Sequence, residues 1–199
     1  MRVVRSLVAL LLVVSLGVRP TEAAEGAGLA GSLLVAEPSL DDPNFDHTVV
    51  LMIQHDAGGA LGVVVNRPYG TAPIAELLRR LGHAEAAADG ELELFYGGPV
   101  QPEVGMIVHS NDYARPETRR VTAEIAVTSD PEALADIAVG KGPRKALPVL
   151  GYAGWGPGQL ESELAQGSWF TLSADPDLVF APEPRRVWQA AFARRGVEL

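Results

Sequence analysis

Hydrophobic residues occur in short runs along the chain, and most of these runs have the length of a β-strand. The two clearest runs are residues 48–54 and 61–66, which flank a turn containing Gly58 and Gly59. Two β-branched apolar runs around such a turn predict a β-hairpin. Neither run alternates cleanly between apolar and polar positions, so we expect both strands to be covered on both faces.

Other apolar runs predict the rest of a sheet. By their length and their β-branched or aromatic content, we expect strands at residues 32–36, 92–96, 106–109, 119–128, 145–153 and 169–173. The first of these is separated from the hairpin by a polar connection, residues 37–45, which contains two prolines.

The spacing of apolar residues changes to a helical period in residues 71–82. One apolar stripe is formed there by Ile74, Leu77, Leu78 and Leu81. Pro73 suits the first turn of this helix and Gly82 suits its end.

Three further segments have helix signals. A helix is expected after Asp130 as N-cap and Pro131 as first residue, another at residues 159–166, and a last one at residues 185–195. Strands with hairpin spacing, mixed with about four single helices, predict an α+β fold and not a regular βαβ winding. We see no repeat and no linker after residue 31, so we expect one domain over residues 32–199.

The N-terminus has the three-part pattern of a secretory signal. Two arginines precede an apolar run at residues 7–16, and small residues precede a possible cut after Ala23. The run is too short for the roughly 20 residues of a membrane-spanning helix. We therefore expect residues 1–23 to be a signal peptide, residues 24–31 a flexible lead, and the protein to be exported to the periplasm. The alternative is a buried N-terminal helix.

The composition of the chain excludes several classes of function and of binding site. The 199-residue chain has 16 basic and 25 acidic residues, a formal charge of −9, so a general nucleic-acid binder is not expected. It has no cysteine, which excludes disulfides, thiolate metal sites and cysteine nucleophiles. No other apolar stretch is long enough to span a membrane, and no serine has the context of a nucleophile motif.

Carboxylates and imidazoles gather early in the chain. The group consists of Asp41, Asp42, Asp46, His47, His55 and Asp56. Such side chains can bind metals or transfer protons. However, His47 and His55 bracket a seven-residue strand and would stand well over 20 Å apart. We expect no metal and no cofactor here.

Two further segments are candidates for binding. Asn66 and Arg67 end a buried strand, and Arg67 either binds an anion bidentately or pairs with a carboxylate. Residues 151–161 are rich in glycine and carry Trp155 just before a helix. This segment is either a ligand platform or a loop whose Trp155 is packed in the core.

Several segments in this order resemble the YqgE/AlgH family of bacterial proteins, which has no established biochemical activity. The matching segments are residues 31–36, Pro38, Leu40, residues 42–45, 48–50, His55, residues 59–62, 66–68, 97–100 and 151–161, followed by Trp169, Phe180 and Trp188. The resemblance covers residues 31 to about 192.

The resemblance implies an α+β fold with a bent, partly barrel-like sheet, and loops that line a shared surface. One member takes its name from a proposed role in regulating alginate synthesis, which is an association and not a mechanism. Family members are usually cytoplasmic and lack a leader, so the apparent signal is a departure that leaves a cytoplasmic location as the alternative. His47 is a second departure, because Arg is common at this position.

We expect a non-enzymatic binding or regulatory protein whose partner is an unidentified protein or small molecule. The expected surface comprises Asp42, Asn44, Phe45, His55, Asn66, Arg67, Gly97, Gly98, Gly154, Trp155, Gly156 and Gln159. One alternative is a hydrolase-type enzyme that uses Asp42, His55 and Arg67. Another is a structural or interaction domain without a small ligand.

Overall fold

The computed structural model describes residues 28–80, 82 and 88–195. These form one domain with ten strands, five α-helices and one 3₁₀ helix. The strands are β1 Ser32–Ala36, β2 Val49–Asp56, β3 Gly59–Val64, β4 Pro68–Pro73, β5 Glu91–Tyr96, β6 Val100–Ser110, β7 Arg119–Arg120, β8 Ile125–Thr128, β9 Ala146–Trp155 and β10 Trp169–Ser173. The helices are α1 Ile74–Arg80, α2 Glu132–Ala138, α3 Gln159–Ala165, α4 Pro176–Val179, the 3₁₀ helix η1 Pro184–Arg186 and α5 Val187–Ala193.

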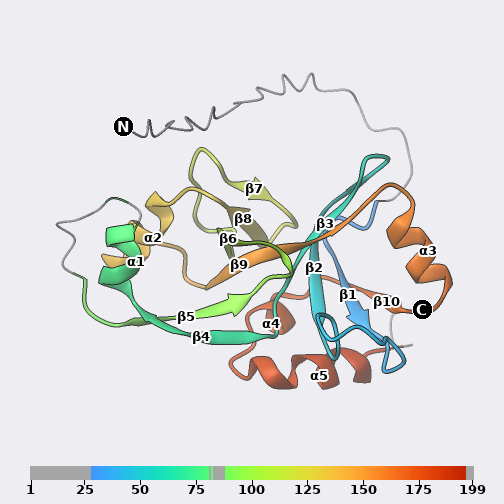
Figure 1. Cartoon of the computed structure of the whole chain (residues 1–199). Helices are drawn as coiled ribbons and strands as arrows, with labels where there is room; N and C mark the ends of the chain where they lie inside the picture. Colours follow the sequence, from blue (N-terminus) through green and yellow to red (C-terminus); the bar gives the residue numbers. More distant parts are fainter. Residues whose placement is uncertain (1–27, 81, 83–87, 196–199) are drawn as a thin grey trace, which may run out of the picture.

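The strands form one curled sheet in the order β10-β1-β2-β3-β9-β6-β8-β7, and β4 and β5 leave this path beside β9. Every pairing is antiparallel except that of β5 with β9. The long strand β9 bends the sheet, because its last residues pair with β3 and its first residues pair with β6 (Figure 1). The prediction of an α+β domain with a bent, partly barrel-like sheet is confirmed.

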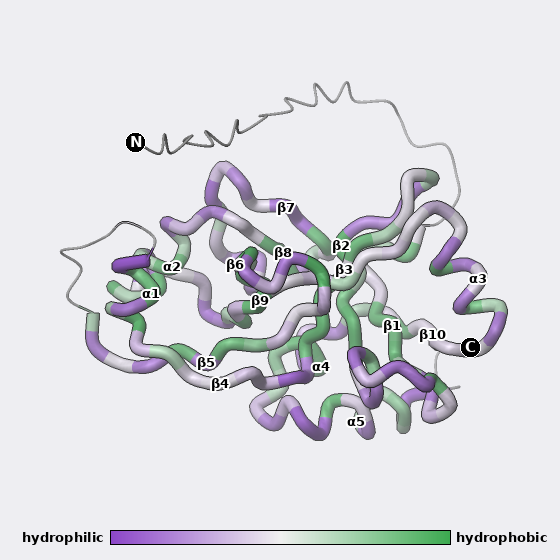
Figure 2. Tube along the Cα trace, viewed as in Figure 1, coloured by the Kyte–Doolittle hydropathy of each residue, from purple (hydrophilic) through white to green (hydrophobic). Residues whose placement is uncertain are grey.

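Apolar side chains cover both faces of β1, β2 and β3. Leu33 and Leu51 point to one face, in a core shared with α4 and α5. Leu34 and Val50 point to the other face, in a core shared with α3. Figure 2 shows these central strands as largely hydrophobic. The expectation that both hairpin strands are covered on both faces is therefore confirmed. A third core lies between α1 and α2 and includes Leu78.

The helix predicted over residues 71–82 begins later than expected. Residues 71–73 belong to β4, where Thr71 pairs with Glu93 and Pro73 with Glu91 of β5. The prediction of a helical start at Thr71 was wrong because pairing with a distant strand decides the conformation of these residues. Leu81, the last residue of the predicted stripe, lies outside the described residues.

The single strand predicted over residues 119–128 is two short strands. β7 and β8 pair with each other, and the chain reverses between them. Thr122 stabilises this reversal, because its hydroxyl oxygen accepts the backbone N–H groups of Glu124 at 3.1 Å and Ile125 at 3.0 Å. β9 is also longer than expected and includes Trp155, so half of the predicted 151–161 loop is a strand.

The predicted signal peptide, residues 1–23, lies outside the described residues. Of the predicted flexible lead, residues 28–31 are described. Leu29 donates its backbone N–H to the His55 ring at 3.0 Å, and Gly31 donates to the carbonyl of Met52 at 2.8 Å. This part of the lead is therefore bonded to β2. Among the described residues, no helix has the length and apolar character needed to cross a bilayer.

Candidate functional site

The connection between β1 and β2, residues 37–48, is held in place by one arginine side chain. We call this connection the clamped loop. The Arg67 guanidinium donates to the carbonyls of Asn44 and Asp46, each at 2.8 Å, and to that of Pro43 at 3.3 Å. Its partners are thus backbone carbonyls of one loop, whereas the sequence had suggested a bound anion or a carboxylate.

The neighbouring side chain of Asn66 holds the end of the same loop. Its carbonyl oxygen accepts the N–H of Val49 at 2.8 Å, and its amide nitrogen donates to the carbonyl of His47 at 2.9 Å. Asn66 is buried and bonded at both ends of its amide. Asn66 and Arg67 therefore act together, because both bind backbone groups of residues 43–49.

Side chains of the clamped loop also bond to each other and to β5. Asp42 accepts the N–H of Asn44 at 2.8 Å. The Tyr96 hydroxyl donates to the Asn44 side chain at 3.4 Å, and Arg67 lies 5.7 Å from the centre of the Tyr96 ring. Burial raises the pKa of Tyr96 above its usual value. Sequence reasoning missed Tyr96, since no motif marks it.

His47 closes the clamped loop in a left-handed backbone conformation, with φ of +53°. Few residues other than glycine adopt this conformation, although it is less rare for histidine. The His47 ring contacts the Asp46 carboxylate and stacks edge-on against Trp188 at 4.2 Å between ring centres. The strained residue is thus supported by contacts on both sides.

Phe45 joins the clamped loop to a pair of indole rings. Its ring centre lies 6.2 Å from that of Trp155 and 5.5 Å from that of Trp169. Both indole N–H groups donate to the same Glu163 oxygen, each at 2.9 Å. Trp155 is only 6% exposed. Of the two possibilities for this residue, the structure shows the packed core residue.

The segment after Trp155 is bonded within itself. The N–H of Gly156 donates to the side-chain oxygen of Gln159 at 3.1 Å, and the Gln159 amide donates to Glu163 at 2.9 Å. Gly154 is a β9 residue opposite Leu61 of β3. Glu163 was missed by sequence reasoning, although its position four residues after Gln159 on a helix was an available signal.

His55 lies at the other end of β2. Its Nδ1 accepts the N–H of Leu29 at 3.0 Å, and its Nε2 lies 2.8 Å from a Glu161 oxygen. These partners require the proton on Nε2. The pKa of Glu161 is lowered by its own backbone N–H and by His55. His55 is six residues from Val49, which Asn66 contacts, so about 20 Å of strand separates the two ends.

Gly97 and Gly98 are needed where two backbones cross. A Cβ on Gly97 would lie 2.3 Å from the carbonyl oxygen of Gly151, and one on Gly98 would lie 2.2 Å from the carbonyl carbon of Tyr152. Neither position has room for a side chain unless the backbone shifts. These glycines allow the chain after β5 to pass close to the backbone of β9.

The expected surface therefore divides into two groups. Asp42, Asn44, Asn66 and Arg67 lie together around the clamped loop, next to Tyr96, which precedes Gly97 and Gly98. The second group, at the far end of β2 and around α3, contains His55, Gly154, Trp155, Gly156 and Gln159. Phe45 contacts Trp155 and bridges the groups. The structure does not bring His55 together with Asp42 and Arg67.

Within residues 28–80, 82 and 88–195, no three His, Asp or Glu side chains are placed to share a metal ion.

Outside the expected surface, His109 is fully buried on β6. Its Nε2 is the buried side-chain atom without a hydrogen-bond partner among the described residues.

Comparison with known proteins shows which family the chain belongs to. A family described as AlgH-like matches residues 33–199. The chain belongs to the AlgH-like family. A UPF0301 protein of Methylococcus capsulatus is 41% identical over 182 residues, covering 91% of this chain and all of the relative. A UPF0301 protein of Caulobacter vibrioides is 42% identical over 176 residues, covering 87% and 90%. The family resemblance inferred from the sequence is confirmed.

Two solved structures have a similar fold. The solution structure of the AlgH protein from Pseudomonas aeruginosa matches with a TM-score of 0.73 and 37% identity, over 88% of this chain and 93% of that one. A crystal structure of a protein from Corynebacterium diphtheriae matches with a TM-score of 0.64 at 24% identity, over 88% and 90%. The second match supports the fold alone.

Proposed function

We propose that this AlgH-like chain is a non-enzymatic binding protein that recognises a partner protein through the clamped loop. The observation that carries the proposal is the rigid presentation of an exposed loop. Arg67 and Asn66 bind backbone groups at five positions between Pro43 and Val49. A surface that is ordered before binding loses less conformational entropy when a partner binds.

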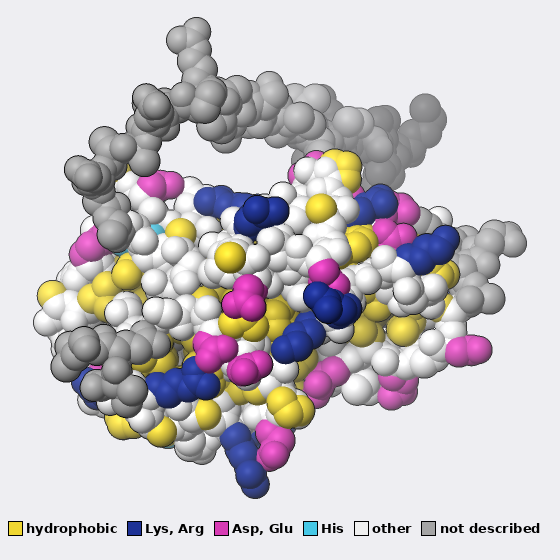
Figure 3. Space-filling model, turned by 180° about the vertical axis from the view of Figure 1, so that it is seen from behind, with side chains coloured by type: hydrophobic (Ala, Val, Ile, Leu, Met, Phe, Trp, Pro, Cys, Tyr) yellow, Lys and Arg dark blue, Asp and Glu magenta, His cyan; other side chains and the backbone are white. Residues whose placement is uncertain are grey.

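The exposed groups of the loop indicate the chemistry of its partner. Asp41, Asn44, Asp46 and His47 are exposed, and the loop also carries the half-buried Asp42. Carboxylate and amide oxygens accept hydrogen bonds, so a partner segment with lysine or arginine side chains would complement them. On the face opposite to that of Figure 1, acidic and basic side chains are interspersed with apolar ones (Figure 3).

The arrangement of the titratable groups also favours binding over hydrolysis. Hydrolysis by Asp42, His55 and Arg67 would need the three side chains in one place, and they lie at two ends of β2. Both His55 nitrogens have partners, the N–H of Leu29 and the Glu161 carboxylate. The Arg67 guanidinium is bonded to loop carbonyls.

Site-specific crosslinking tests the proposal. A photo-reactive amino acid replaces Asn44 in one strain and Val139, a 65% exposed residue on the α2 side, in another. We expect specific partner proteins to crosslink at residue 44 but not at residue 139. Adding Arg67→Ala should reduce their yield by roughly tenfold, because the loop is released; this corresponds to about 1.4 kcal/mol.

The matched control is Arg79→Ala, which removes an arginine that is paired with Glu76 on α1. This variant should leave the crosslinks at residue 44 unchanged. Equal crosslinks at residues 44 and 139, or the same yield with and without Arg67, would contradict the proposal.

We also propose that the protein works in the cell envelope, because residues 1–23 have the pattern of a secretory signal. The intact mass of the native protein from separated cell fractions tests this. We expect a chain that starts near Ala24 in the periplasmic fraction. A full-length chain in the cytoplasm would contradict the proposal and favour an intracellular role.

A further inference from the structure

A pocket of about 350 Å³ lies where β5 and β9 separate. The two strands are paired only through Phe95 with Val149 and Tyr96 with Leu150. Before these pairs, β5 is bonded to β4 and β9 is bonded to β6. Over residues 91–94 and 146–148, the facing edges of the two strands therefore lack a strand partner. The two strands diverge here, and the pocket is the space between them.

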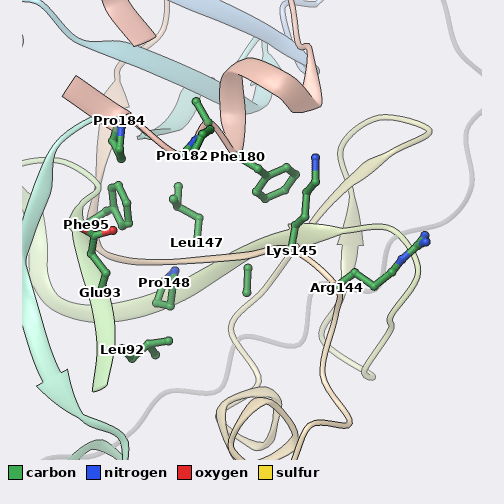
Figure 4. Close-up of a pocket in the computed structure, with 12 residues that line it drawn as sticks. Leu92, Glu93, Phe95, Arg144, Lys145, Leu147, Pro148, Phe180, Pro182 and Pro184 are labelled. Atoms are coloured by element: carbon green, nitrogen blue, oxygen red, sulfur yellow. The ribbon is translucent and has the colours of Figure 1, made fainter. Parts of the chain in front are cut away.

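The floor and walls of the pocket are apolar. Phe95 and Leu147 form part of the floor, at 4% and 6% exposure, together with the buried Pro148. Phe180 and Pro182 cover it from the segment between α4 and η1 (Figure 4). The pocket is at the small end of the roughly 300–1,000 Å³ range of ligand sites, so it suits a small molecule.

Groups of opposite charge stand on two sides of this apolar floor. Figure 4 shows Glu93 of β5 on one side and Lys145, next to β9, on the other. The Lys145 ammonium lies 3.8 Å from the exposed Asp177 carboxylate and 5.7 Å from the centre of the Phe180 ring. Ion pairs as exposed as this one are weak, so the ammonium remains available to a ligand.

The adjacent Arg144 is engaged elsewhere. Its Nε donates to Asp112 at 2.8 Å, and its side chain points away from the pocket in Figure 4. The backbone of Lys145 is fixed by Ser110, which donates its N–H to the Lys145 carbonyl at 3.0 Å. The backbone from which the Lys145 side chain extends is therefore fixed beside the floor.

We infer that this pocket binds a small zwitterion with an apolar side chain, either a free amino acid or a dipeptide. The ligand carboxylate would pair with Lys145, its ammonium with Glu93, and its apolar group would lie on Phe95, Leu147 and Pro148. The unpaired edges of β5 and β9 offer backbone hydrogen bonds that a dipeptide can use. The inference is independent of the clamped loop, which contributes no residue to the pocket.

The test is a titration of the ¹⁵N-labelled full chain with L-leucine and with L-leucyl-L-leucine, followed by amide chemical shifts. We expect saturable shifts, at millimolar concentration of at least one probe, confined to β5, the start of β9 and residues 180–184. Binding of leucine but not of the dipeptide identifies a free amino acid as the ligand, and the reverse identifies a peptide. No saturable shift with either probe overturns the inference.

Two charge-removing variants test the assigned contacts. Lys145→Gln and Glu93→Gln should each weaken binding by about threefold to fivefold, as expected for partly exposed ion pairs. In Lys145→Gln the probe and its C-terminal amide should bind equally well, and in Glu93→Gln the probe and its N-acetyl form should bind equally well. Lys141→Gln and Glu103→Gln, exposed residues outside the pocket, are the controls.

A third variant separates the pocket from its charges. Ala146→Phe fills the space beside the floor and keeps both charged groups. We expect it to abolish the shifts of both probes. Undiminished binding in Ala146→Phe, or in both charge variants, would overturn the inference. Amide shifts of β1 and β2 report in every variant that the fold is intact.

Discussion

The two halves of the curled sheet differ in how completely their strands pair. In the closed half, made of β10, β1, β2 and β3 with α3 and α5, β1 is paired on both sides and buried at every position after Ser32. In the open half, made of β4 to β8, α1, α2 and the start of β9, β5 meets β9 at two residue pairs only. Complete pairing leaves little space, whereas the partial pairing of β5 leaves a pocket.

The same difference governs the polar side chains. In the closed half and along its rim, Asn66, Arg67, His55 and Glu163 are bonded to backbone or to neighbouring side chains. In the open half, the Lys145 ammonium lies 3.8 Å from the exposed Asp177 carboxylate and over the Phe180 ring. The distinctive sequence motifs therefore stabilise the fold and its loop, while Lys145 beside the pocket keeps an ammonium that a ligand can reach.

The largest effect is expected from truncating one leucine in each half. Leu51→Ala removes a fully buried side chain of β2 and should lower the free energy of unfolding by about 2–5 kcal/mol. Leu92→Ala, at the half-buried wall of the pocket, should cost less than about 1 kcal/mol. Chemical denaturation of the two variants measures the difference. Equal losses would show that the halves are packed alike.

A smaller effect is expected from the carboxylate that joins α3 to the closed half. Glu163→Ala leaves the indole N–H groups of Trp155 and Trp169 without their acceptor and should cost about 1–3 kcal/mol. Thermal unfolding followed by tryptophan fluorescence measures this loss. Glu124→Ala, at an exposed side chain in the β7–β8 turn, is the control and should be nearly neutral.

The smallest effect on folding stability is expected from protonation of Asp112 at low pH. The hydroxyl of Ser110 and the guanidinium of Arg144 lower the pKa of Asp112 to about 2, so the folded state binds this proton less readily than the unfolded chain. Its contribution is complete above the ordinary aspartate pKa near 4 and is lost as the pH falls towards 2. Asp112→Asn should therefore reduce the change in stability over this interval.

Amide hydrogen exchange measures whether the loss of stability in acid is confined to the open half. Residues around Ser110 and Arg144, beside the pocket, should lose protection as the pH falls from about 4 to about 2. The central strands β1 and β2 are held by apolar contacts and should keep their protection. A simultaneous loss in both halves would mean that they unfold as one unit.

The sequence predicted the closed half better than the open half for a physical reason. The β2–β3 hairpin depends on neighbouring β-branched residues and a glycine turn, which are local signals. The conformation of Thr71–Pro73 depends instead on pairing with Glu91–Glu93, and the helical spacing of the apolar residues that follow was the stronger local signal. The β7–β8 reversal was missed because no glycine or proline marks residues 121–124.

The candidate site was predicted in part. The family resemblance implied that residues 42–45 and 66–67 line one surface, and Arg67 does bond to that loop. The contacts of His55 with Leu29 and Glu161 were not predicted, because they depend on the curl of the sheet and no local sequence pattern indicates that curl. The pocket was not predicted, because its lining comes from three separate segments without a shared motif.

The pairing of β1 with β10 has a consequence for biosynthesis. Ser32 lies opposite Ser173, and the Trp188 indole donates to the carbonyl of Ala36 across 152 residues of chain. The edge of β1 that pairs with β10 therefore stays uncovered until nearly the whole polypeptide has been synthesised. Contacts of such long range slow folding, and an uncovered edge invites association with other chains. Newly made chains of this protein therefore pass through a stage in which the edge of β1 is open to association with other chains.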